Sequence, residues 1–229
     1  MNRIVQPELL DTLPPVDPRA VRSRRDLRRV NGWMCHHAVM AGALQSALNR
    51  RAPGQIVELG AGDGNFLLRV GQKISPRRPN VNVTLLDLQK NVSAETLAAF
   101  AALGWRAEAI VADVFDWLQT SGAREVVIAN LFLHHFADTR LAELLRLISQ
   151  RAKLFIAIEP RRAPWPLFCC RLLWAVGCSD VTRHDATVSV RAGFSGNELS
   201  AFWPDKQNWQ LKERRTGAFS HLFIARKII

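Results

Sequence analysis

The sequence predicts an α/β fold, in which a largely parallel sheet carries helices on both faces. Two observations predict it. From residue 55 to residue 160, short apolar segments alternate with amphipathic ones, and near its end the chain has two strand-like segments joined by a short link. Strands that alternate with helices form right-handed βαβ units, which place the strands parallel to one another. A length of 229 residues fits one such domain.

Each expected strand is a short run rich in Val, Ile and Leu. The strands of the parallel series are expected at residues 55–59, 82–88, 107–113, 125–130 and 153–160. The helices that follow the first four strands are expected to start near Asn65, Ala94, Val114 and Thr139. An antiparallel hairpin is expected at the sheet edge, because the link TGAF separates residues 209–215 from residues 220–227.

The first fifty residues lie outside this alternation. Residues 1–20 contain four prolines and no periodic apolar pattern, so we expect an arm over residues 1–22 that lies on the surface or is partly disordered. Apolar side chains then recur every three or four residues from Leu27 to Leu44. This spacing predicts one or two packed helices over residues 23–52, ahead of the first strand. Residues 23–229 are expected to form the single domain.

The composition excludes some classes of protein and leaves others open. No stretch reaches the roughly 18 to 20 apolar residues of a membrane span, and the first residues lack the apolar core of a secretory signal, so we expect a cytoplasmic protein. The four cysteines are not spaced as a CxxC pair, and we expect reduced thiols. The net charge of +11 would attract nucleic acid, an anionic membrane or acidic small molecules alike.

The segment VELGAGDGNF, residues 57–66, follows an expected strand and precedes an expected helix. Glycines at positions 60, 62 and 64 let backbone amides approach a ligand closely. Dinucleotides and S-adenosylmethionine are the two ligand classes bound by such a turn. A dehydrogenase is disfavoured, because the run Gly60-Ala61-Gly62-Asp63-Gly64 lacks the GxGxxG spacing.

Polar side chains follow or end four successive expected strands: Glu58, Asp87, Asp113 and Asn130. In open α/β sheets, ligands bind at the carboxyl edge of the strands. Asp87 lies 27 residues after Gly60, where an acid can bind ribose hydroxyls. Asp113 can accept a hydrogen bond from an adenine amino group, while the amide of Val114 can serve a ring nitrogen.

With these motifs the chain resembles the class I S-adenosylmethionine-dependent methyltransferases, from about residue 23 to the end. VELGAGDG, LLDL, ADVFD and IANLFLHHF are similar to the first four motifs of that family. The resemblance implies S-adenosylmethionine as cofactor and a Rossmann-like sheet of seven strands, the last antiparallel. It also implies an N-terminal helical cap at residues 23–52 and a substrate-cover insertion at residues 161–194, after the fifth strand.

The resemblance further implies which residues bind the cofactor. Gly60 and Gly62 would lie near its methionine part, Asp87 on the ribose, and Asp113 with Val114 on the adenine. The full expected set is Asn31, Trp33, Glu58, Gly60, Ala61, Gly62, Asp87, Leu88, Asp113, Val114 and Asn130. Structural roles remain open for several of them: a tight turn for the glycines, a helix N-cap for Asp113 and a core position for Trp33.

Methyl transfer to a hydroxyl needs the acceptor aligned with the methyl group and its proton removed. The candidate bases are His134, His135 and His184, with Arg183 as a stabiliser of a phenolate. His135 has an alternative role as a hydrogen-bonded core residue. On an extended strand, Asp185 could orient His184 only if the backbone bends, because neighbouring side chains there face opposite ways.

The form LHHF is similar to enzymes that methylate quinone precursors, phenols and polyketides. Some quinone-pathway relatives bind a divalent metal through a Glu-x-x-Glu-His run in this region. Here the run is LFLHH, residues 131–135, which has neither carboxylate. We therefore expect no metal and a reaction that uses a histidine base alone.

The segment PWPLFCCRLLWAVGC, residues 164–178, is apolar apart from Arg171. Its length fits a buried or interfacial helix better than a membrane span. If it faces the active site, the substrate is lipophilic or aromatic; ordinary core packing is the alternative. Together with the basic residues 19–29, it would suit a molecule presented at an anionic membrane.

The sequence thus favours O-methylation of a phenolic or polyketide-like small molecule. The alternative is an RNA methyltransferase, which the charge of +11 suggests. Against RNA, NLFL differs from the Asn/Asp-Pro-Pro-aromatic run of enzymes that methylate nucleic-acid amino groups, and no Pro-Cys pair is present. A cofactor-binding regulator without turnover has no feature in its favour. The sequence does not indicate an oligomeric state.

Overall fold

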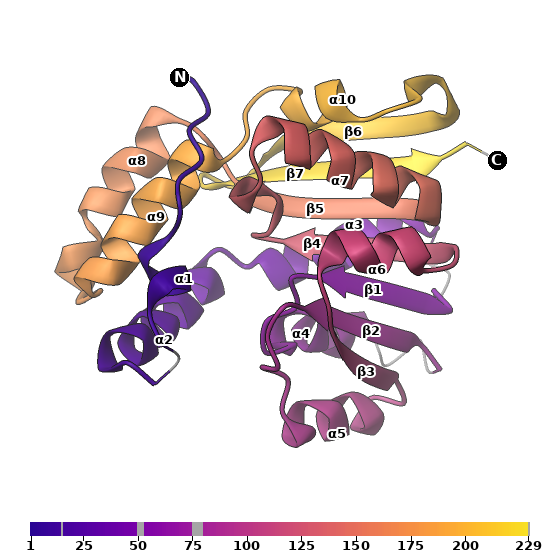
Figure 1. Cartoon of the computed structure of the whole chain (residues 1–229), viewed down its shortest axis with the longest axis horizontal. Coiled ribbons are helices and arrows are strands. Elements are labelled where there is room, and N and C mark those ends of the chain that lie inside the picture. The colour runs from indigo at the N-terminus through magenta and orange to yellow at the C-terminus, as the bar shows by residue number, and fades with distance from the viewer. Residues whose placement is uncertain (15, 50–52, 75–79, 229) are drawn as a thin grey trace.

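The computed structural model describes residues 1–14, 16–49, 53–74 and 80–228 (Figure 1). Its centre is a seven-stranded sheet with the order β3-β2-β1-β4-β5-β7-β6. The strands are β1 (Gln55–Leu59), β2 (Asn82–Asp87), β3 (Arg106–Val111), β4 (Arg124–Asn130), β5 (Ala152–Pro160), β6 (Trp209–Thr216) and β7 (Ser220–Lys227). The predicted α/β class and seven-stranded sheet are confirmed, and the strand boundaries differ from the expected ones by at most two residues.

The sheet order reverses beside its first strand. β1 pairs in parallel with both β2 and β4, and β5 continues the parallel series beyond β4. β7 then inserts between β5 and β6 and runs antiparallel to both, as the predicted hairpin requires. The carboxyl ends of β1 and β4 therefore diverge into connections on opposite faces, and this switch point is where open α/β sheets bind ligands.

Helices cover both faces of the sheet, and in β1, β2, β4 and β5 alternate side chains are buried on opposite sides. In β1, Ile56 belongs to one buried cluster and Val57 to the other. The Ile56 side is covered by α3 (His36–Ala47), α4 (Asn65–Ile74) and α5 (Ala94–Ala102). The Val57 side is covered by α6 (Val114–Thr120), α7 (Asp138–Arg151) and α10 (Glu198–Phe202). This double burial explains why the strands read as continuous apolar runs.

The N-terminal arm is anchored in the fold more firmly than the sequence predicts. It contains the short helix α1 (Leu9–Thr12), and α2 (Pro18–Trp33) begins inside the range assigned to the arm. The Arg3 side chain is only 8% exposed; its Nε donates to the Ala192 carbonyl at 2.7 Å and its guanidinium pairs with Asp138 at 2.7 Å. Figure 1 shows the indigo arm running beside α9 (Asp180–Ala192). A proline-rich composition does not reveal such contacts, because their partners lie far along the chain.

The segment after β5 forms helices over the range of the expected insertion. These are α8 (Pro164–Arg171), the 3₁₀ turn η3 (Leu173–Val176) and α9. The interpretation of His184 and Asp185 as strand neighbours was wrong, because α9 is a helix whose first turn is capped by the Ser179 hydroxyl, which accepts from the Thr182 amide at 3.3 Å. Two further 3₁₀ turns are η2 (Leu133–His135) and η4 (Lys206–Asn208). None of the helices in the described ranges is both long and apolar enough to cross a bilayer.

Candidate active site

The glycine loop between β1 and α4 is held against the end of β2. The Gly62 amide donates to Asp87 Oδ2 at 2.8 Å, and the Ala61 amide donates to the Leu86 carbonyl at 3.0 Å. Gly60 and Gly62 both have positive φ, +67° and +55°. A Cβ on Gly60 would lie 2.3 Å from the Phe132 ring, whereas one on Gly62 would have no neighbour within 4 Å. The loop therefore needs glycine at position 60 and leaves free space beside position 62.

Glu58 is a buried acid that lacks a hydrogen-bond partner. It is 2% exposed, and its Oε2 atom has no partner among the described residues. Burial, reinforced by the charges of Asp63 and Asp87, raises the pKa of the Glu58 carboxyl well above its ordinary value. A polar group placed beside the loop would satisfy the unpartnered Oε2 atom of Glu58.

The acids after β2 and β3 both bind backbone amides. Asp87 accepts from Gln89 as well as from Gly62, at 2.9 Å and 2.8 Å. Asp113 is the N-cap of α6, where its Oδ1 accepts from the Phe115 amide at 2.7 Å. The helix-cap role left open for Asp113 is therefore present. The cap leaves the Asp113 carboxylate able to accept further hydrogen bonds, because each oxygen of an ionised carboxyl can accept more than one.

Two apolar side chains follow these acids. Leu88 is 68% exposed directly after Asp87, and Val114 is 7% exposed directly after Asp113. The exposed leucine offers an apolar surface directly after the carboxylate of Asp87. This donor and acceptor set fits an adenosyl group: acceptors for ribose hydroxyls and an amino group, and an apolar surface for a purine ring.

Asn130 is fixed at the end of β4 by a histidine that the sequence reasoning missed. His36 Nδ1 lies 2.9 Å from Asn130 Oδ1, and His36 Nε2 lies 2.6 Å from the Ser220 hydroxyl. Burial lowers the pKa of His36 to about 4, so the imidazole is neutral and its two nitrogens form one donor and one acceptor. His36 thereby joins the helical cap to β4 and β7. It lies inside the range predicted to be helical, and the apolar spacing that predicted the helices does not single it out.

His134 is a buried cation between two carboxylates. Its Nδ1 lies 2.8 Å from Glu159 Oε2, and its Nε2 lies 3.6 Å from Glu8 Oε1. Burial opposes the charge, but hydrogen bonds to Glu159 and Glu8 and their negative charges outweigh it and raise the pKa of His134 to about 9. Glu159 also accepts from the amides of Phe132 and Leu133. His134 therefore keeps its proton at neutral pH.

His135, the next residue, is in the opposite state. Its side chain is 36% exposed, and its Nδ1 lies 4.0 Å from Asp11 Oδ2. Partial burial and the positive charge of His134, whose ring centroid is 4.2 Å away, lower the pKa of His135 below its ordinary value. His135 is therefore neutral near pH 7 and can accept a proton.

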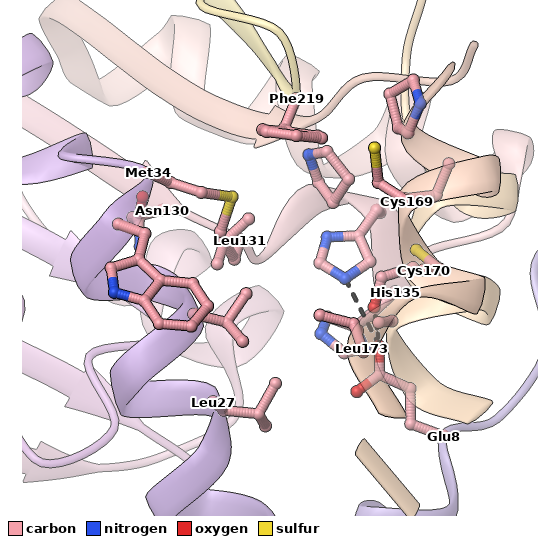
Figure 2. Close-up of a pocket in the computed structure, with 18 residues that line it drawn as sticks. Glu8, Leu27, Met34, Asn130, Leu131, His135, Cys169, Cys170, Leu173 and Phe219 are labelled. Carbon is pink, nitrogen blue, oxygen red and sulfur yellow. Dashed lines mark hydrogen bonds and ion pairs between the residues drawn. The ribbon is translucent and has the colours of Figure 1, made fainter. Parts of the chain in front are cut away.

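A cavity of about 430 Å³ lies above the carboxyl ends of β4 and β5. Figure 2 shows Leu27 and Met34 on one side and Cys169 and Leu173 on the other. Four of the sequence candidates line it: Trp33, Asn130, His134 and His135. Glu8, from the N-terminal arm, also lines it and was not expected. The walls come from α2, α8, α9 and the loop after β4, and their side chains are mostly apolar.

Comparison with known proteins agrees with this geometry. Residues 56–153 match the family model described as a methyltransferase domain. No curated protein matches the chain. Among solved structures, the plantazolicin methyltransferase BpumL, in complex with SAH, is similar with a TM-score of 0.66 at 13% identity, over 93% of this chain and 92% of that one.

Two further structures share the fold over part of their length. The mitomycin 7-O-methyltransferase MmcR has a TM-score of 0.61 at 21% identity, over 96% of this chain and 60% of that one. An O-methyltransferase family protein from Burkholderia thailandensis has a TM-score of 0.60 at 17% identity, over 93% of this chain and 60% of that one. At these identities the likeness establishes the fold, and the matched domain adds the activity.

Residues 56–153 of this chain carry a methyltransferase domain, and the chain has the fold of class I methyltransferases. Its cofactor is S-adenosylmethionine, in agreement with the resemblance inferred from the motifs.

The structure does not bring every candidate of the methyltransferase into the cavity. His184 lies on α9 with its side chain 47% exposed, and its Nδ1 is 3.0 Å from Asp185 Oδ1. Arg183 pairs with Asp180 one turn earlier on the same helix. Neither His184 nor Arg183 is among the described residues that line the cavity. The side chain of Asn31 lies outside the part of the chain that the structure describes.

The charged state of His134 makes stability depend on pH. The unfolded chain loses the proton of His134 near pH 6.5, whereas the folded methyltransferase keeps it to about pH 9. The contribution of His134 to the free energy of unfolding should therefore be largest below pH 6.5. It should fall by about 3 kcal/mol as the pH rises to 9. Urea unfolding at a series of pH values measures it.

His134→Gln should remove that decline and lower the stability at pH 6. His37→Gln is the matched control: the pKa of His37 is lowered, mainly by burial, so it contributes no decline above pH 6.5. If the free energy of unfolding changes equally with pH in the wild type and in His134→Gln between pH 6.5 and 9, His134 is not the charged group inferred here.

Proposed function

We propose that this methyltransferase methylates a hydroxyl group of a lipophilic, phenolic or polyketide-like small molecule, without a metal ion. The cavity carries the proposal: its volume of about 430 Å³ suits a small ring system, and its walls are mostly apolar. It lies beside Asn130, at the switch point of the sheet. The similar mitomycin 7-O-methyltransferase supports a small-molecule acceptor.

We assign the cofactor to the carboxyl edge of β1, β2 and β3. Asp87 would accept hydrogen bonds from the ribose hydroxyls, and Asp113 with the Val114 amide would bind the adenine, which would pack on Leu88. The free space beside Gly62 and the unpartnered Glu58 Oε2 support a polar methionine group there. Trp33, 61% exposed and on the cavity wall, would lie on the acceptor side of the methyl group.

We assign the general base to His135. The acceptor oxygen would attack the methyl carbon in line with the sulfur, the carbon–sulfur bond would break with its electron pair on sulfur, and His135 would take the hydroxyl proton. His135 is neutral and lines the cavity. His134 already holds a proton between two carboxylates, and His184 does not line the cavity, so neither fits this role as well.

The chemistry of the donor groups supports a reaction without metal. Glu8, His134 and His135 bring ligand atoms within 4.8 Å of one another, the arrangement in the described residues nearest to a metal site. In this set the carboxylate of Glu8 is already neutralised by the imidazolium of His134, which lowers the pKa of Glu8 against the effect of burial. The set is therefore satisfied as an ion pair.

Asp87→Ala should weaken the binding of S-adenosylhomocysteine by about a hundredfold, because two hydrogen bonds to a carboxylate are lost. Isothermal titration calorimetry measures the affinity. Asp116→Ala, an exposed acid in the first turn of α6, is the control and should bind as the wild type does. An unchanged affinity in Asp87→Ala would place the ribose elsewhere.

Radiolabelled S-adenosylmethionine should label phenolic compounds and leave total RNA unlabelled. The physical reason is the cavity, whose apolar walls accept a small ring and offer few groups for a phosphate backbone. Scintillation counting of the separated fractions measures the transfer. Labelling of RNA alone would reverse the order of the two hypotheses.

His135→Ala should lower kcat by about 10² to 10⁴, the usual contribution of a positioned base, with cofactor affinity unchanged. His184→Ala is the control, because it removes a histidine of the same type from outside the cavity. Turnover is measured with a phenolic acceptor across pH 6 to 9. A wild-type rate in His135→Ala would exclude it as the base.

A further inference from the structure

The segment α8–η3 exposes a row of large apolar side chains to solvent. They are Trp165 (56% exposed), Phe168 (49%), Leu172 (46%), Trp174 (64%) and Val176 (39%), and together we call them the aromatic face. The rings of Trp165 and Phe168 stack with their centroids 5.8 Å apart. Contiguous exposed apolar side chains of this kind mark an interaction site more often than single exposed residues do.

The cavity does not account for the aromatic face. The cavity is lined by the other side of the same segment, through Pro166, Cys169, Cys170 and Leu173. None of the five residues of the aromatic face is among its lining residues. The segment is therefore apolar on two sides, one turned to the substrate site and one to solvent.

A strongly basic helix lies beside the aromatic face. α2 contains six arginines and a single acid, Asp26, which is 1% exposed and accepts from the Ser179 amide at 2.8 Å. Arg22 and Arg29 of α2 donate to the carbonyls of Gly177 and Val176, at 3.4 Å and 3.3 Å. The arginines at positions 22, 25, 28 and 29 are exposed. We call these four residues the basic face.

We propose that the aromatic face and the basic face together form a docking surface for an anionic lipid bilayer. Tryptophan and phenylalanine insert at the boundary between headgroups and acyl chains, and arginines beside them attract anionic headgroups. Each arginine near such a surface adds to the attraction. The proposal does not depend on the acceptor proposed above.

The composition of the surface favours lipid over two other partners. RNA would use arginines and stacked aromatic rings, but Leu172 and Val176 have no ring to stack on a base and would stay exposed. A second copy in a two-fold contact would bring the basic face of each chain near that of the other, which costs electrostatic energy. A bilayer satisfies the aliphatic, aromatic and charged groups together.

Vesicle co-sedimentation of the full chain tests the proposal. The protein should bind vesicles of phosphatidylcholine with phosphatidylglycerol at least about ten times more tightly than vesicles of phosphatidylcholine alone. Added salt should weaken this binding. Brominated lipids should quench part of the tryptophan fluorescence, because Trp165 and Trp174 would insert.

Two pairs of variants separate the apolar and the charged contributions. The double variant Trp165→Ser with Trp174→Ser should lower the vesicle affinity about tenfold and abolish the quenching. The control Val111→Ser, at a residue 55% exposed on β3, should do neither.

The double variant Arg25→Glu with Arg28→Glu should remove the preference for anionic vesicles. Arg106→Glu with Arg146→Glu, exposed on β3 and α7, changes the net charge equally and should retain it. Equal thermal unfolding midpoints confirm that the variants are folded.

Three results would overturn the proposal. The first is equal binding to neutral and anionic vesicles, or none to either. The second is binding of RNA that displaces the protein from vesicles and is lost in the same variants. The third is a dimer in analytical ultracentrifugation that Trp165→Ser with Trp174→Ser converts to a monomer, which would mean that a second copy covers the aromatic face.

Discussion

A single buried carboxylate, that of Glu159, holds the loop on which the cavity depends. It lies at the penultimate position of β5, is fully buried, and accepts hydrogen bonds from the Phe132, Leu133 and His134 amides and from the His134 ring. A buried carboxylate is tolerated only when its oxygens are satisfied, so these contacts are mutually required. Because the bound amides lie two to four residues after Asn130, Glu159 fixes the loop that follows β4 and carries the two histidines.

The adjacent histidines show how environment separates the protonation states of one residue type. His134 faces two carboxylates and is charged, while His135 faces the cavity and is neutral partly because His134 is charged. Their ring centroids are 4.2 Å apart. Pairs of groups whose surroundings drive their pKa values apart are a recurrent feature of catalytic sites. The ion pair thus gives the loop its shape and also keeps the neighbouring imidazole available for a proton.

The sequence predicted local features well and distant contacts poorly. The five parallel strands, the glycine loop and the acids at Asp87 and Asp113 follow from periodicity and spacing within short segments. The contact of His36 with Asn130 joins residues 94 positions apart, and that of Glu8 with Ser189 spans 181. No pattern in a single sequence encodes such pairings. The helix α9 was missed for a local reason, since its alternating Val and polar residues near position 188 also suit a strand.

The anchoring of the N-terminal arm has a consequence for how the chain acquires its structure. Arg3 bonds to Ala192, which is 189 residues further along, and the amides of Leu9 and Leu10 bond to the buried carboxylate of Asp185. During translation the arm therefore emerges well before residues 185–192, and its contacts cannot form until those residues have been synthesised. The cavity, which the arm helps to enclose through Glu8, should be among the last parts of the described structure to assemble during translation.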